Sequence, residues 1–303
     1  KAGGLSVKQI WRELKSQNVF YYIAAFSIIV ILIITVLGSY LYRFYYRTIY
    51  TDFLVSNEEH LRWEMNRHEN DIQIINDIVY QMGLAAEVTK FKLSEKPLAA
   101  LQLEKHLFQY TTVSQFFRLL LYQYHEDGYL YSSTTSVDSD YFAEQGCVME
   151  RMDAQTVKEE LSAESKELRV FPEQSVSGFW VQKYIGNSRI VLYMQAIPPK
   201  FQETLVFFVP DTYYDSLMIN EAEDLRSDFI LYDDEVIVSR ESRETDHAAL
   251  LELIKESGEQ RQVKLDGEKY LLTVQQGDSG MLYCSLQDMD IFMIRLSPDS
   301  GES

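Results

Sequence analysis

Cysteine, proline and glycine are all scarce in this sequence of 303 residues, which contains 2, 6 and 13 of them respectively. Cys147 and Cys284 lie far apart and form neither a disulfide framework nor a metal-ligand spacing. We expect both to be small, partly buried apolar residues, and a bridge between them stays open as an alternative. So few prolines and glycines argue against low-complexity disorder and against collagen-like repeats.

Positive charge is also scarce, because 28 Lys and Arg stand against 46 Asp and Glu and the net charge is −18. Residues 1–47 hold six basic side chains against Glu13 alone, a net +5, so the remainder of the chain carries −23. A surface this acidic repels phosphate backbones, which argues against nucleic acid as a partner of this region.

Motifs of catalysis are missing as well. The five histidines make no HExxH or paired metal spacing, and neither a GxSxG nor a Walker-type glycine-rich loop occurs. We therefore expect no catalytic residues, no metal site and no cofactor, and a surface hydrolase is the weakest functional alternative.

What the sequence does contain is one long apolar run. Residues 18–42 carry no charge, which is enough for a helix to cross the ~30 Å hydrocarbon layer of a lipid bilayer. Tyrosines stand at both ends of the run, where aromatic rings prefer the headgroup level. A cleavable signal peptide would be shorter and would be followed by small residues, whereas bulky Tyr and Phe follow here. Lys8, Arg12 and Lys15 favour a cytoplasmic N-terminus, so we expect a cell-membrane protein with its bulk outside the cytoplasm.

A second long helix pattern follows directly. After a first step of seven, apolar residues and His68 recur at alternating steps of four and three up to residue 82, with neither Gly nor Pro between Ser39 and Met82: Leu54, Leu61, Met65, His68, Ile72, Ile75, Val79 and Met82. We call the members from Leu61 to Met82 the stalk seam. The seam could pack along its own domain, or the membrane-near half of the helix could pair with a second copy, so a homodimer through the stalk helix is expected. His68 is interpreted as accommodated by packing.

Beyond the stalk the hydrophobic period changes to that of strands. Helices are predicted at 97–110 and 154–161, with strands at 116–124, 129–133, 178–184, 189–197 and 203–209. A shorter second set repeats the order hairpin, helix, strands: strand, turn and strand over 228–239, a helix over 247–257, and strands at 262–265, 269–274 and 281–286.

This arrangement resembles the double Cache sensors of bacterial transmembrane receptors. The closest local similarities are the hairpins at 122–133, 231–239 and 266–272, which approach the pattern of apolar strand, Asp-Gly turn and strand. The resemblance implies an α+β fold: one transmembrane helix continuing into a long stalk helix, then two PAS-like antiparallel-sheet subdomains. The domains expected are a cytoplasmic segment 1–17, a transmembrane helix 18–42, a stalk 43–84, a membrane-distal subdomain 85–212, a membrane-proximal subdomain 213–296 and a tail 297–303. The Arg-x-Trp-Tyr stretch of amino-acid-binding members is absent from 140–151, so the ligand class stays open.

Candidate ligand contacts come from residues that would share a strand face. They are Arg118, Tyr122 and Tyr124 on one strand, Trp180 and Tyr184 (with Gln182) on another, and Tyr193 and Gln195 on a third. Aromatic walls with one cation and a few amides would suit a sugar, a carboxylate or a peptide fragment. Arg118 would need an anionic partner if it were buried.

We therefore predict the extracytoplasmic sensing region of a receptor with an unknown small-molecule ligand. It would be the input half of a membrane-bound AraC-type regulator or a sensor histidine kinase, with a chemoreceptor as a third option and the output domain beyond Ser303. The alternative is a membrane-anchored surface scaffold without a small-molecule ligand. An enclosed pocket in the distal subdomain would favour the sensor, and a filled core with an exposed apolar patch would favour the scaffold.

Overall fold

The computed structural model describes residues 7–84, 93–198, 200–218, 226–255, 260–265 and 267–289. The chain divides into two compact units, residues 1–59 and residues 60–303. The predicted tail 297–303, the last two residues of the predicted helix 247–257 and Asp266 of the third hairpin lie outside the described residues.

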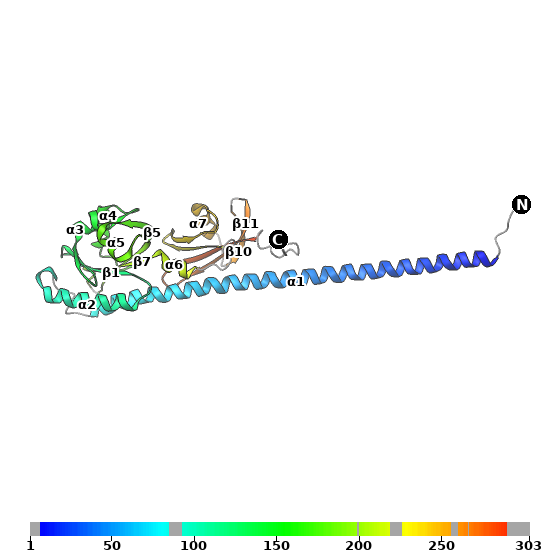
Figure 1. Ribbon diagram of the computed structural model, residues 1–303, viewed down its shortest axis with the longest axis horizontal. Coiled ribbons are helices and arrows are strands. Elements are labelled where there is room, and N and C mark those ends of the chain that lie inside the picture. Colours follow the sequence, from blue (N-terminus) through cyan, green and yellow to red (C-terminus); the bar gives the residue numbers. More distant parts are fainter. Residues whose placement is uncertain are drawn as a thin grey trace. The chain divides into compact units, whose positions relative to one another are not determined.

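The first unit contains the N-terminal part of helix α1, which is assigned from Val7 to Leu84 (Figure 1). Within the described residues, α1 is the one helix long and apolar enough to cross a membrane. Its large apolar side chains between Tyr21 and Tyr45, apart from Val30, are 54–78% exposed in the single chain. A core helix of a soluble protein would bury such side chains, so the exposure agrees with the predicted membrane segment.

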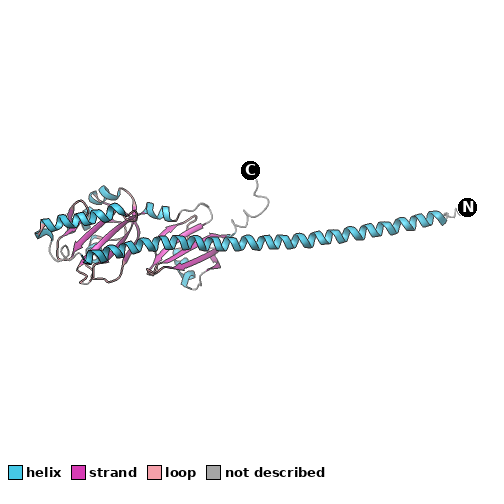
Figure 2. Cartoon of the chain, turned by 90° about the horizontal axis from the view of Figure 1, so that it is seen from below, coloured by secondary structure: helices cyan, strands magenta, loops and turns pink. Residues whose placement is uncertain are grey.

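Two antiparallel sheets make up most of the second unit, and Figure 2 shows their strands as two groups. The seven-stranded sheet has the order β3-β2-β1-β7-β6-β5-β4, and the five-stranded sheet has the order β10-β11-β12-β8-β9. The first sheet contains β1 (Leu119–Tyr124), β2 (Tyr129–Tyr131), β3 (Ser136–Asp138), β4 (Val148–Met149), β5 (Arg169–Ser177), β6 (Arg189–Ala196) and β7 (Glu203–Pro210). The second contains β8 (Arg226–Tyr232), β9 (Glu235–Arg240), β10 (Gln260–Leu265), β11 (Glu268–Gln276) and β12 (Leu282–Asp288).

The helices of the second unit are short apart from α1 and α2. They are η1 (Leu93–Glu95), α2 (Pro97–Val113), α3 (Ser139–Tyr141), η2 (Phe142–Gly146), α4 (Ala154–Leu161), α5 (Phe179–Ile185), α6 (Asp211–Leu217) and α7 (His247–Lys255). The predicted helices at 97–110, 154–161 and 247–257 are therefore confirmed over their described residues.

The predicted internal repeat is visible in the strand order. Within the first sheet the strands run β2-β1-β7-β6-β5, and the second sheet runs β9-β8-β12-β11-β10. Each series starts with the second strand of a hairpin, continues with the first, and then follows the last three strands in reverse chain order. The α+β class with a long N-terminal helix and two antiparallel sheets is confirmed.

One predicted strand is wrong. Instead of a strand at 178–184, the chain forms helix α5 (Phe179–Ile185), with Gly178 at its N-cap and Gly186 at its C-cap. Gly178 has φ +122°, and a Cβ there would lie 2.5 Å from the carbonyl oxygen of Gly146, so only glycine fits this helix start. Val181 and Ile185 form the buried face at helical spacing. Of the β-branched and aromatic residues that indicated a strand, Val181 is buried, Trp180 and Tyr184 pack against the same cluster, and Phe179 is exposed.

The stalk seam packs inside its own unit. Its members from Leu61 to Met82 join a cluster that also contains side chains of both sheets, such as Phe207 of β7 and Ile230 of β8. Ile75 is fully buried and Leu61 is 1% exposed. Each such aliphatic side chain contributes about 1.5–3 kcal/mol when it is removed from water. Of the two packing modes that the sequence left open, the intramolecular one accounts for the seam between residues 61 and 82.

A triad of buried, oppositely charged side chains connects helix α1 to the second sheet. Arg226 on β8 donates to Glu64 of α1 at 2.9 Å and to Asp228 at 2.6 Å, and all three side chains are 6% exposed or less. Burial raises the pKa of Asp228 to about 6, although the charge of Arg226 acts in the opposite direction. Removal of one member of such a triad strongly destabilises the folded protein, because it leaves a buried charge without its partner.

Both cysteines are free and buried. Cys147 belongs to the cluster on the outer side of the first sheet, and Cys284 to the cluster between β12 and α7. Their predicted role as small buried apolar residues is confirmed.

Candidate functional site

The predicted ligand residues divide between the two faces of the first sheet. Arg118 precedes β1, and Tyr122, Tyr124, Tyr193 and Gln195 lie on the face that packs against the stalk seam, as the alternation along β1 and β6 requires. Trp180 and Tyr184 lie on α5 and pack against the cluster on the opposite face. The structure thus brings five of the seven residues to one side of one sheet, but not into one pocket.

The outer face of the first sheet is filled by apolar side chains. The cluster beneath α4 and α5 contains buried Leu121, Phe142, Val157 and Phe208 among others. The rings of Trp180 and Tyr184 contact each other at a tilt of 50° with centroids 4.8 Å apart, as expected for residues four apart on a helix. This packing corresponds to the filled core that the sequence analysis set against an enclosed pocket.

At the hairpin end of the first sheet, polar groups are buried together. The Tyr122 hydroxyl is buried and finds no hydrogen-bond partner among the residues that the structure describes, while Tyr131 donates to Asp127 at 3.0 Å. Burial raises the pKa of Glu203 to about 7, and the charge of Lys200 opposes that rise. Gln195 donates to the carbonyl of Lys166 at 3.1 Å, so its amide is engaged within the protein.

His68 lies at the centre of a polar network on the stalk-facing side. It is fully buried among the rings of Phe116, Tyr193, Tyr213, Tyr214 and Tyr283. Its Nδ1 is 2.8 Å from the Tyr283 hydroxyl, and its Nε2 is 3.1 Å from the Tyr193 hydroxyl. Desolvation lowers the pKa of His68 from 6.5 to about 3, so the ring is neutral.

The directions of these hydrogen bonds can be assigned. Tyr283 donates its only hydroxyl proton to Glu69 at 2.8 Å, so His68 Nδ1 must be the donor toward Tyr283. A neutral imidazole then has an acceptor at Nε2, which receives the proton of Tyr193. Tyr214, 2.7 Å from Tyr193, supplies the next donor. One chain of hydrogen bonds therefore runs from Tyr214 through His68 to Glu69.

The carboxylate of Glu69 completes the chain at the second sheet. It accepts from the Ser279 hydroxyl at 2.6 Å and from the Ser279 backbone N–H at 2.9 Å, in the turn between β11 and β12. A Cβ at Gly277 would overlap this carboxylate, so a larger residue there would displace the Glu69 side chain. We call the residues Glu69, His68, Tyr193, Tyr214 and Tyr283 the stalk junction, because they tie α1 to both sheets.

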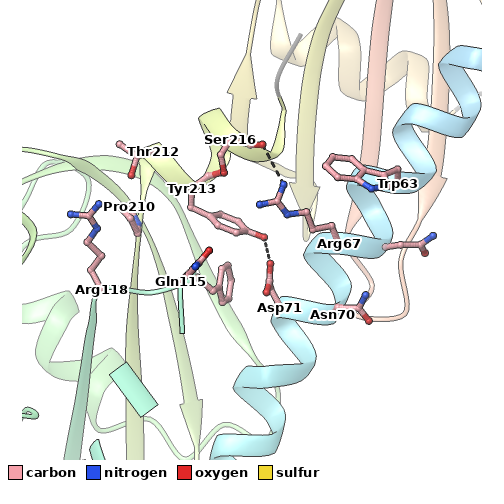
Figure 3. A pocket seen from close by; sticks show the side chains of 12 residues that line it. Trp63, Arg67, Asn70, Asp71, Gln115, Arg118, Pro210, Thr212, Tyr213 and Ser216 are labelled. Carbon is pink, nitrogen blue, oxygen red and sulfur yellow. Dashed lines mark hydrogen bonds between the residues drawn. The ribbon is translucent and has the colours of Figure 1, made fainter. Parts of the chain in front are cut away.

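A cleft of about 550 Å³ lies beside the stalk junction (Figure 3). We call it the stalk cleft. Helix α1 contributes Trp63, Asn66, Arg67, Asn70 and Asp71; the segment before β1 contributes Gln115, Phe116 and Arg118; the β7–α6 region contributes Pro210, Thr212, Tyr213 and Ser216. Its floor is formed by Phe116 and Tyr213, whose rings meet edge to face at 4.8 Å. Both of these rings also contact His68.

The three charged side chains of the stalk cleft, Asp71, Arg67 and Arg118, differ in the contacts that they make within the protein. Tyr213 donates to Asp71 at 2.6 Å, a bond that Figure 3 shows between α6 and α1. Arg67 lies over the Trp63 ring at 5.4 Å and makes a long contact of 3.4 Å to the carbonyl of Ser216. Arg118 is exposed rather than buried, and its guanidinium has no hydrogen bond or ion pair from the described residues. An anionic partner is therefore not required inside the protein, and the cation is available in the cleft.

Most lining residues of the stalk cleft were missed from the sequence. Trp63, Arg67 and Asp71 follow each other at steps of four along α1, one stripe away from the seam, which is the signal that could have found them. Tyr213 and Ser216 lie on α6, a helix that the sequence analysis did not predict after Pro210.

The fold is similar to several solved sensory domains. The sensory domain of the Campylobacter jejuni chemoreceptor Tlp3 with isoleucine bound has a TM-score of 0.53 and 14% identity, covering 82% of this chain and 97% of that chain. The Tlp3 ligand-binding domain with 4-methylisoleucine gives 0.54 and 13%, covering 80% and 93%. The extracellular domain of rpHK1S-Z16, which is named as a histidine kinase, gives 0.50 and 11%, covering 82% and 99%.

Comparison of the sequence itself is less informative, since no protein-family model and no curated protein matches it. At identities of 11–14% the likeness concerns the fold. The predicted resemblance to double Cache sensors is confirmed at that level: the chain has the fold of the sensory domains of chemoreceptors and of a histidine kinase.

Proposed function

We propose that this chain is the extracytoplasmic sensing region of a bacterial transmembrane receptor. Residues 18–42 would cross the bilayer, with residues 1–17 in the cytoplasm and the sheets outside it. The observation that carries the proposal is the stalk junction, because the helix that contains the apolar segment is hydrogen-bonded through His68 and Glu69 to both sheets. A ligand beside that junction can alter the position of the helix. The role inferred is binding, not catalysis.

The output would be an AraC-type DNA-binding domain or a histidine kinase, with a chemoreceptor signalling domain as the third option. The sensory domains similar in fold belong to chemoreceptors and to a protein named as a histidine kinase, which supports a signalling output without selecting one. Reading the coding sequence downstream of Ser303 tests this point directly, because each output has a recognisable domain.

The location can be tested with the full chain in bacterial membranes. Alkaline phosphatase fused after Ser303 should be active, because the enzyme folds only outside the cytoplasm, and green fluorescent protein at the same site should be dark. The reverse result would place the sheets in the cytoplasm and would refute the proposed topology.

We also infer a homodimer through the stalk helix. The seam from Leu61 to Met82 is occupied within the chain, so over this part of α1 the contact would use another face. Trp63 and Ile74 are 53% and 39% exposed and lie eleven residues apart, which places them on one face of α1. In membranes, Ile74→Cys should form a disulfide-linked dimer and the buried Ile75→Cys should not. Equal cross-linking of the two variants, or none for Ile74→Cys, would contradict a dimer through this face.

A second candidate function is a membrane-anchored scaffold. Its support is the apolar packing of the outer face of the first sheet, together with Phe179 at the start of α5, which is 85% exposed. A scaffold would show no thermal shift with any member of a metabolite panel, whereas a sensor would be stabilised by at least one.

A further inference from the structure

The stalk cleft is built from three separate parts of the chain. Helix α1 forms one wall, the segment before β1 forms another, and α6, which follows the last strand of the first sheet, forms the third. A molecule in the cleft would contact the stalk and the first sheet at the same time. Its volume of about 550 Å³ lies within the range of ordinary small-molecule sites.

The charge of the cleft is opposite to that of the chain. The protein has a net charge of −18, yet the cleft holds two guanidinium groups, Arg67 and Arg118. Among the lining residues that the structure describes, Asp71 is the only carboxylate, and its Oδ2 already accepts the proton of Tyr213 at 2.6 Å. Neither arginine forms an ion pair with a described residue; Arg67 rests on Trp63, and Arg118 reaches the cleft from beside Pro210 (Figure 3).

The other lining groups indicate what the remainder of a ligand would look like. The amides of Asn66, Asn70 and Gln115 can donate and accept hydrogen bonds at the rim. The rings of Trp63 and Phe116 offer apolar contact to a short carbon skeleton. Guanidinium groups match carboxylates in a bidentate geometry, which a neutral sugar cannot use.

We propose that the stalk cleft binds a small organic acid, with a carboxylate on Arg118 and a second anionic or carbonyl group on Arg67. This inference rests on the sensor function proposed above and names the ligand class of that sensor. The site lies on the stalk-facing side of the first sheet, opposite the filled cluster beneath α4 and α5.

The floor of the cleft gives the ligand a route to the stalk junction. Phe116 and Tyr213 each contact the His68 ring, with centroids 5.9 and 6.1 Å away. Tyr213 also joins α6 to α1 through Asp71. A ligand with one group on Arg118 and another on Arg67 would close α6 and the β1 segment onto the stalk, at the point where His68 contacts both sheets.

The test uses the full chain in detergent with four probes: succinate, citrate, neutral succinamide and inorganic phosphate. Binding is followed by titration calorimetry and by Trp63 emission, assigned by its loss in Trp63→Phe. We expect succinate or citrate to bind and succinamide to bind at least tenfold more weakly. Arg118→Gln and Arg67→Gln should each weaken binding about 10- to 100-fold, as expected for the loss of a charge-assisted hydrogen bond.

Two further variants complete the test. Lys105→Gln removes a positive charge from the exposed face of α2, outside the cleft, and should leave the affinity unchanged. Arg118→Lys keeps the charge without the bidentate fork and should weaken binding less than Arg118→Gln. Wild-type affinity in both arginine-to-glutamine variants would overturn the proposal, as would binding of phosphate alone. Stabilisation by succinamide equal to that by succinate would overturn the acid class while leaving a sensor intact; the phosphatase fusion tests the topology independently.

Discussion

His68 makes the stability of this fold depend on pH in a defined window. The pKa of its ring falls from 6.5 to about 3 because the neutral form is buried without an acidic partner in direct contact. Two carboxylates of α1 bond to tyrosines that surround His68: Glu69 accepts from Tyr283, and Asp71 accepts from Tyr213. Unfolding frees the ring to take up a proton wherever the pH lies below 6.5.

The sign and size follow from linkage. Because the folded pKa is lowered, the unfolded state binds more protons between pH 6.5 and 3, and stability falls as pH falls through that window. The full effect of 3.5 pKa units is about 5 kcal/mol, and the part between pH 7 and pH 5 is about 2 kcal/mol. Glu203 acts in the opposite direction, since its raised pKa of about 7 stabilises the fold at low pH and that contribution is lost as pH rises.

The assay compares urea unfolding of the full chain with that of His68→Gln at pH 7 and pH 5. The glutamine can hydrogen-bond Tyr193 or Tyr283 but cannot titrate, and Glu203 is present in both proteins, so its effect cancels in the difference. The free energy of unfolding of the wild type should fall between the two pH values by about 2 kcal/mol more than that of the variant. His106→Gln, on the exposed face of α2, is the matched control and should follow the wild type. Parallel profiles for wild type and His68→Gln would refute the assignment of a neutral buried imidazole.

Two further predictions concern packing and backbone. Ile75→Ala should lower the free energy of unfolding by about 2–5 kcal/mol because the side chain is fully buried. Ile74→Ala, at the neighbouring but 39% exposed position, should change it by about 1 kcal/mol or less. Thermal unfolding compares the two variants, and equal losses of stability would contradict the assigned seam. Gly178→Ala should destabilise the folded protein by about 1–3 kcal/mol, because φ is +122° and the added Cβ would meet the Gly146 carbonyl. Gly128→Ala is the control, because a Cβ at Gly128 would lie in open space. A wild-type melting temperature for Gly178→Ala would show that α5 does not begin as described.

Long periodic patterns were predictable from the sequence. The apolar run at 18–42 and the seam from Leu61 to Met82 depend on many residues that agree with each other, and the hairpins are fixed by turn residues between apolar strands. The repeated order of hairpin, helix and strands followed from those patterns, and both sheets have the same strand arrangement.

Short and mixed segments were not predictable in the same way. Strand β5 was missed because Pro172 and polar residues interrupt it; the structure accommodates them with a register shift between Phe171 and Gln174. Helix α5 was taken for a strand because seven residues are too few to separate a period of 2 from 3.6. Tertiary packing decided both cases.

The candidate site shows the same limit. Arg118 was identified because it lies at the start of a clear strand, but its partners in the cleft come from α1 and α6, far away in sequence. Trp180 and Tyr184 were placed with it by a strand period that does not apply to a helix. His68 was noticed as a polar residue in an apolar seam, but its five aromatic neighbours come from four separate parts of the chain, which no local pattern reveals.

The polar ties of α1 limit how a sensor of this build could signal. Three polar side chains within two turns of α1 bond to the two sheets. Glu64 forms an ion pair with Arg226. His68 forms hydrogen bonds with Tyr193 and Tyr283, and Glu69 forms one with Ser279. A purely apolar seam could slip by one turn and keep most of its contacts. Here such a slip would break a buried ion pair, which costs about 3–5 kcal/mol. It would also leave several buried polar groups without hydrogen-bond partners, at about 1–3 kcal/mol each. A ligand shifts an equilibrium only by its differential affinity for two states, which is commonly a few kcal/mol. The signal proposed here therefore consists of movements smaller than one helical turn, in which α6 and the β1 segment close on the stalk while the junction at His68 stays bonded.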